Sequence, residues 1–183
     1  YEKEIEELDV RQFYRRMVDH PGSYPKSSMP NVQDYLEAFE PFASAGVPVI
    51  CICITTKFSG SYASASAAGG ILLEKYPGAR IKVIDSGVNT VLQGMLVLEA
   101  VKMQKAGFGF QEAADKIEEI KGSGRIFFTI GSMEYLVHGG RVGKLMGLAG
   151  TTLGIKPLIT LKDGEIFPSG ITRSRRKSRK KVL

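Results

Sequence analysis

The chain has 183 residues, an apolar fraction of 43% and a formal net charge of +6 at pH 7. This length suits one domain of ordinary size, or one domain with part of a second. No apolar run reaches the roughly 18 residues that a membrane-spanning helix needs. Nothing at the N-terminus has the pattern of a signal peptide. We therefore expect a cytoplasmic protein without a transmembrane segment.

Strands and helices are predicted to alternate along most of the chain, from apolar periodicity and from capping residues such as Asp9 and Asn31. In chain order, the predicted elements are helices over 9–18 and 32–45, a strand over 47–55, a helix over 61–75, a strand over 81–84, helices over 91–106 and 110–121, and a strand over 125–130. This alternation predicts an α/β fold, layered α/β/α, with a mostly parallel sheet.

The pattern changes after Ile155. Two alternating segments, Lys156–Leu161 and Glu165–Ser169, flank an Asp-Gly turn and predict a β-hairpin. Seven basic residues without an acid among them follow, so the rest of the chain is nearly neutral: Arg173, Arg175, Arg176, Lys177, Arg179, Lys180 and Lys181. Such a run can bind nucleic acid or anionic lipid. Because no aromatic residues are interleaved for base stacking, we expect either a solvated helix face or a frayed chain end, and no nucleic acid.

The two cysteines, Cys51 and Cys53, lie two positions apart in the predicted strand 47–55. Their side chains should share one face, at a spacing too long for an unstrained disulfide. His20 and His138 are the only histidines, so no cluster of metal ligands is predicted. We interpret both cysteines as core thiols in a reducing compartment.

The most informative segment is the turn from Thr55 to Ser61, Thr-Thr-Lys-Phe-Ser-Gly-Ser. It follows a buried strand and opens a helix, whose unpaired N–H groups and dipole favour an anion. Ser59 as a nucleophile would need a base, but neither histidine comes with a recognisable acid partner. The glycine-rich phosphate loop ending in Lys-Ser/Thr is also absent. The turn is therefore predicted to hold an anionic head group.

Three further segments have both a structural and a functional interpretation. Ser27-Ser28-Met29-Pro30 precedes a helix cap and suits either turn formation or ligand contact. Asp85-Ser86, at the end of a strand, is more typical of a braced turn than of a titrating group. Gly139-Gly140-Arg141 can direct a guanidinium at a carboxylate, or be an ordinary surface turn. The small apolar residues from Leu145 to Ile155 suit an apolar ligand wall.

Taken in order, these segments resemble the DegV family of bacterial fatty-acid-binding proteins. Ser27-Ser28-Met29-Pro30 is similar to a Thr-Ser-Gln-Pro motif, and Thr55–Tyr62 to a Ser-Ser-Lys-Leu-Ser-Gly-Thr-Tyr motif. Asp85-Ser86, Tyr135–Val142 and Ile155-Lys156-Pro157 match later motifs of the family. Ser27 keeps the hydroxyl of the usual Thr, whereas Met29 lacks the amide of the usual Gln.

The resemblance implies that a palmitate-like fatty acid lies between two α/β domains, with no cofactor and no catalysis by the protein itself. Its carboxylate would be held by Ser27 and Ser59, with Ser28, Thr56, Gly60 and Ser61 beside them and Arg141 near the mouth. A fatty acid kinase is the implied partner. Residues 1–154 would then be an incomplete N-terminal head-group domain, and 155–183 the hairpin and basic segment that begin a second domain.

An enzyme acting on a small phosphorylated substrate is the alternative, because a hydroxyl-rich turn at a helix N-terminus binds phosphate equally well. Phosphoryl transfer needs carboxylates to hold a metal. None lies near Thr55–Ser61 in the sequence, so this alternative is the weaker one.

Overall fold

The computed structural model describes residues 7–148 and 155–183. Its elements are α1 (Val10–Asp19), α2 (Val32–Ser44), β1 (Val49–Cys53), α3 (Ser61–Lys75), β2 (Ile81–Asp85), α4 (Thr90–Lys105), α5 (Phe110–Ile120), β3 (Ile126–Thr129), α6 (Glu134–His138), the 3₁₀ helix η1 (Gly143–Leu148), β4 (Lys156–Lys162), β5 (Glu165–Thr172) and α7 (Arg175–Val182). Each predicted helix and strand is present within a few residues of its expected bounds, and the predicted α/β fold is confirmed.

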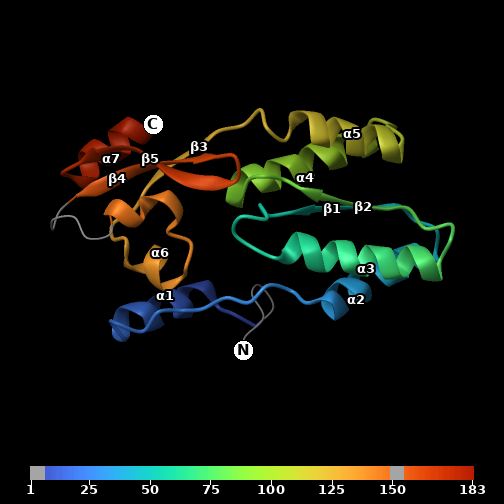
Figure 1. Ribbon diagram of the computed structural model, residues 1–183, viewed down its shortest axis with the longest axis horizontal. Helices are drawn as coiled ribbons and strands as arrows, with labels where there is room; N and C mark the ends of the chain where they lie inside the picture. The colour runs from blue at the N-terminus through green and yellow to red at the C-terminus, as the bar shows by residue number, and fades with distance from the viewer. Residues whose placement is uncertain (1–6, 149–154) are drawn as a thin grey trace.

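The first sheet pairs β1 with β2 in parallel, from Val49 opposite Ile81 to Cys53 opposite Asp85. Helices α2 and α3 lie on one side of this sheet, and α4 and α5 on the other (Figure 1). Ala65 and Ala68 of α3 are fully buried against the strands, since small side chains allow a helix to approach a sheet closely. This layer is the α/β/α arrangement that the sequence predicts.

The second sheet is antiparallel, with strand order β3-β4-β5. The strand predicted over 125–130 is therefore present, but it pairs with β4 and not with the parallel sheet: Ile126 lies opposite Leu161, and Thr129 opposite Leu158. A buried, apolar composition predicts a strand without specifying its partner. The division at residue 154 stays a prediction, and the β3–β4 pairing crosses it.

The β4–β5 hairpin confirms the predicted Asp-Gly turn. Lys162 pairs with Glu165, and Asp163 and Gly164 have φ angles of 50° and 79°. Two consecutive positive φ values are what a two-residue hairpin turn of this type requires. The basic segment forms α7, whose arginines and lysines are exposed while Ser178 is buried, as expected for a solvated helix face.

A second core joins the two sheets. It contains Leu145 of η1, Ile159 and Leu161 of β4 and Ile166 of β5, with Ile52 and Phe58 of the first layer packed against it. The hairpin therefore lies against the end of β1 from which the Thr55–Ser61 turn leaves.

Cys51 and Cys53 are both free thiols on one side of β1, with 3.7 Å between their sulfur atoms. The hydrogen bond with Cys53, together with burial, raises the pKa of Cys51, so it stays a neutral thiol. This agrees with the core-thiol interpretation.

Candidate functional site

The turn from Thr55 to Ser61 connects β1 to α3, as the sequence predicts. The N–H of Thr55 donates to Val88 O at 2.9 Å, and the N–H groups of Phe58 and Ser59 both donate to Thr55 O. Helix α3 begins at Ser61 after Gly60, which has no side chain to cap it. The turn is thus tightly bonded within itself and to the loop that follows β2.

Two of the predicted hydroxyls lie together on this turn. Ser59 Oγ is 2.8 Å from Ser61 Oγ and also accepts the N–H of Ser61. Burial raises the pKa of Tyr35, against the lowering effect of a hydrogen bond with Ser61. Ser61 is 8% exposed and Ser59 half-buried, so of the two the Ser59 hydroxyl is the more accessible to a ligand.

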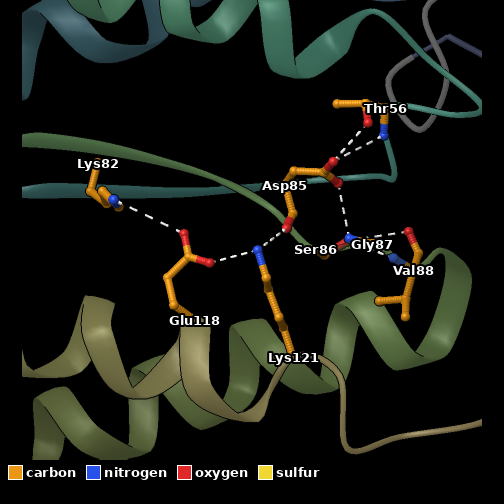
Figure 2. A network of polar contacts seen from close by, with 8 residues as sticks. All are labelled: Thr56, Lys82, Asp85, Ser86, Gly87, Val88, Glu118 and Lys121. Carbon is orange, nitrogen blue, oxygen red and sulfur yellow. Dashed lines mark hydrogen bonds and ion pairs between the residues drawn. The ribbon is translucent and has the colours of Figure 1, made fainter. Parts of the chain in front are cut away.

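Thr56 directs its hydroxyl elsewhere. Its Oγ1 donates to Asp85 Oδ2 at 2.8 Å (Figure 2). A hydroxyl carries a single proton to donate, and in this arrangement Asp85 accepts it. The structure therefore places Thr56 against the end of β2.

The segment that contains Ser27 and Ser28 lies beside the start of α3. A Cβ atom added to Gly60 would lie 2.6 Å from Sδ of Met29, closer than any real contact. A side chain at position 60 would therefore displace the end of the Met29 side chain. The two hydroxyl-rich motifs, separated in the sequence by α2 and β1, meet at this contact. Ser27 and Ser28 are both exposed.

Arg141 joins the turn to a shallow cavity. Its Nε donates to Phe58 O at 3.3 Å, and Nη1 donates to Gly139 O. The cavity has a volume of about 250 Å³ and is lined by Pro25, Lys26, Ser27, Tyr135, His138, Gly139 and Arg141. The structure thus brings Ser27 and Arg141 to one cavity, and Arg141 connects that cavity to the turn that carries Ser59.

The remaining predicted ligands, Ser28, Thr56, Ser59, Gly60 and Ser61, are not among the residues that line this cavity. Convergence of Ser27, Ser59 and Arg141 on one carboxylate therefore stays a prediction. Within the expected apolar wall, Leu145 is fully buried and Met146 is 58% exposed. Residues 149–154 of that wall lie outside the described residues.

Two features of the cavity were not predicted from the sequence. Lys26 adds a second cation beside Arg141. The ring of His138 stacks on that of Tyr24, with centroids 3.7 Å apart and planes inclined by 11°, and this stack holds the 21–31 segment against α6. Nothing in the sequence around His138 indicates a stacking partner as distant along the chain as Tyr24.

The family model described as "Uncharacterised protein, DegV family" matches residues 1–183. The chain belongs to the DegV family. A DegV domain-containing protein of Clostridium perfringens is 34% identical over 178 residues, which is 97% of this chain and 60% of that protein. The resemblance inferred from the motifs is confirmed.

Solved structures of fatty-acid-binding proteins have the same fold. A stearic acid-binding protein from Eubacterium ventriosum is 46% identical with a TM-score of 0.90, covering 96% of this chain and 60% of that one. A fatty-acid-binding DegV protein of Thermus thermophilus is 26% identical with a TM-score of 0.84, and the match covers 98% of this chain and 62% of that one. The fatty acid kinase B3 protein of Streptococcus pneumoniae, loaded with linoleic acid, is 29% identical with a TM-score of 0.82. The match covers 95% of this chain and 60% of that one.

This chain spans about 60% of the length of the relatives that it matches. Among the residues that the structure describes, no helix is long and apolar enough to cross a membrane. The same residues contain no group of three or more His, Cys, Asp or Glu side chains arranged to hold a metal ion.

Proposed function

We propose that the protein binds a long-chain, palmitate-like fatty acid without transforming it and presents it to a fatty acid kinase. The observation that carries this proposal is the convergence of Ser27 and Arg141 on one cavity, beside the turn that holds Ser59. A guanidinium and serine hydroxyls are hydrogen-bond donors suited to a carboxylate. The stearic acid and linoleic acid that the relatives bind support the same ligand class.

In this proposal the acyl chain supplies most of the affinity, and the head-group site determines how the fatty acid is oriented. Each buried methylene contributes about 0.8 kcal/mol, whereas one hydrogen bond to a charged group contributes roughly 1.5–3 kcal/mol. The S. pneumoniae protein, named for a fatty acid kinase, supports the proposed partner. The free thiols of Cys51 and Cys53 agree with a cytoplasmic location.

The enzyme hypothesis has less support. Phosphoryl transfer to a small substrate depends on metal-bound charge stabilisation. The structure does place one carboxylate against the turn, that of Asp85, but it accepts the Thr56 hydroxyl and the Gly87 N–H, and His138 is stacked on Tyr24 in the cavity wall. We propose no catalytic residue.

Titration of the full-length protein with a C16 fatty acid and the alcohol of equal length tests the proposal. We expect the acid to bind more tightly, and Ser27→Ala, Ser59→Ala and Arg141→Ala each to weaken acid binding about tenfold or more. The double variant of the two serines should be non-additive if both contact one anion. Ser169→Ala, an exposed serine on β5, is the matched control. Equal binding of acid and alcohol would refute the head-group assignment.

A further inference from the structure

The Asp85-Ser86 pair at the end of β2 lies outside the residues proposed to contact the ligand. Because β1 and β2 are parallel and Cys53 lies opposite Asp85, their carboxyl ends meet at one edge of the sheet. Asp85 Oδ2 accepts the hydroxyl of Thr56 at 2.8 Å, and Oδ1 accepts the N–H of Gly87 at 2.9 Å (Figure 2). The Asp85 carboxylate thus contacts the head-group turn directly.

Ser86 holds Thr55, the residue before Thr56 in the turn, by way of Val88. It is 1% exposed, and its N–H donates to Cys53 O at 3.0 Å. Its hydroxyl donates to Val88 O at 3.2 Å and accepts the N–H of Val88 at 3.3 Å. Val88 O in turn accepts the N–H of Thr55. The consecutive residues Asp85 and Ser86 therefore fix the consecutive residues Thr56 and Thr55.

The main chain of Asp85 is held from the opposite side by α5 and the segment that follows it. Lys121 Nζ donates to Asp85 O at 2.9 Å and forms an ion pair with Glu118 at 2.5 Å. Glu118 also lies 4.0 Å from Lys82 Nζ. Figure 2 shows these contacts on one side of Asp85 and the turn on the other. With its backbone fixed in this way, the carboxylate has a defined position from which to hold Thr56.

We propose that Asp85 is a positioning residue for the head-group site, acting through Thr56. Its carboxylate accepts the only proton of the Thr56 hydroxyl, directs that side chain away from the ligand, and fixes the backbone path that leads to Ser59. The Thr56 side chain then stabilises the turn and makes no bond to the ligand. This inference rests on the proposed function, because it assigns a role at the same head-group site.

Four variants of the full-length protein test it: Asp85→Ala, Thr56→Val, their double variant and Thr56→Ser. Each is titrated with a C16 fatty acid and with the alcohol of equal length. We expect Asp85→Ala and Thr56→Val each to weaken acid binding about tenfold, with alcohol binding changed less than about twofold. The double variant should be no weaker than the worse single one. Thr56→Ser, which keeps the hydroxyl, should retain acid binding.

Glu119→Gln is the matched control, because it removes an ion pair with Lys116 on the same helix and none of the printed contacts of Asp85. It should leave the melting temperature nearly unchanged and should not change the ratio of acid to alcohol affinity. Where Asp85→Ala does not fold, Asp85→Asn and the two Thr56 variants carry the comparison.

The opposing hypothesis, in which Thr56 itself binds the ligand, predicts a different effect of Asp85→Ala on acid binding. Removing Asp85 would then free the Thr56 hydroxyl and remove a negative charge, so acid binding would stay the same or strengthen. That result, additive loss in the double variant, or equal loss for acid and alcohol would overturn the inference. A wild-type protein that does not prefer the acid would refute the proposed head-group site instead.

Discussion

Among the glycines that the structure describes, Gly164 in the hairpin turn is predicted to be the one at which alanine is most destabilising. Its φ is 79°, and a left-handed backbone costs an L-residue about 1 kcal/mol or more. An added Cβ would overlap Oγ1 of Thr55 and lie 3.1 Å from Cγ of Lys57. The same change displaces the 3.2 Å hydrogen bond from Thr55 Oγ1 to Gly164 O. With overpacking at about 1–3 kcal/mol and the hydrogen bond at roughly 0.5–1.5 kcal/mol added to this strain, we expect Gly164→Ala to cost about 2.5–5.5 kcal/mol.

Urea denaturation of Gly164→Ala and Gly107→Ala separates the overlap from the backbone strain. Gly107 has a similar φ of 86°, and nothing lies within 4 Å of its added Cβ, so its replacement should cost only the strain of about 1 kcal/mol. With an m-value of roughly 1–3 kcal/mol/M, the midpoint of Gly164→Ala should lie about 1 M below that of the control. Equal midpoints would refute the contact between the hairpin and the turn as a source of stability.

Two further changes test the surroundings of the site. Gly60→Ala should change the free energy of unfolding by less than about 1 kcal/mol, because the end of the Met29 side chain can move. It should nevertheless weaken fatty acid binding in calorimetric titration, and adding Met29→Ala should restore that binding. Hydrogen bonds from Lys75 and Tyr76 hold the pKa of Glu40 below its usual range, so their stabilising effect is complete above the unfolded-state pKa and is lost as pH falls through the folded-state pKa. Thermal unfolding should therefore show Glu40→Gln destabilised at neutral pH but matching the wild type in acid, and a difference independent of pH would contradict this cause.

Local signals in the sequence were sufficient for most of the fold. Asn31 predicts the start of α2, and the structure has its side chain bonded to the N–H groups of Gln33 and Asp34. Asp163-Gly164 predicts the hairpin turn because only residues that tolerate positive φ suit it. The strand, hydroxyl-rich turn and helix around Ser59 were predicted in order, since each depends on neighbours in the sequence.

Contacts between distant segments had no such signal. The composition of β3 predicts a strand but leaves open its pairing with β4. The hydroxyl of Thr56 suits a ligand as well as it suits Asp85, and only the parallel register of β1 and β2 brings the two together. The bond from Arg141 to Phe58 O likewise joins residues 83 positions apart in the sequence. The family resemblance supplied the candidate residues, and the structure supplied their arrangement.

The contact between Thr55 and Gly164 joins residues 109 positions apart in the sequence, whereas a two-residue turn closes the hairpin that contains Gly164. A hairpin of this kind forms within roughly 1–10 μs, but a distant contact must first overcome the entropy of closing a long loop. We expect the hairpin and the helix-covered parallel strands to form separately and to meet late in folding. The head-group site would then be absent from every partly folded state, so a bound fatty acid should slow unfolding while leaving the rate of folding unchanged.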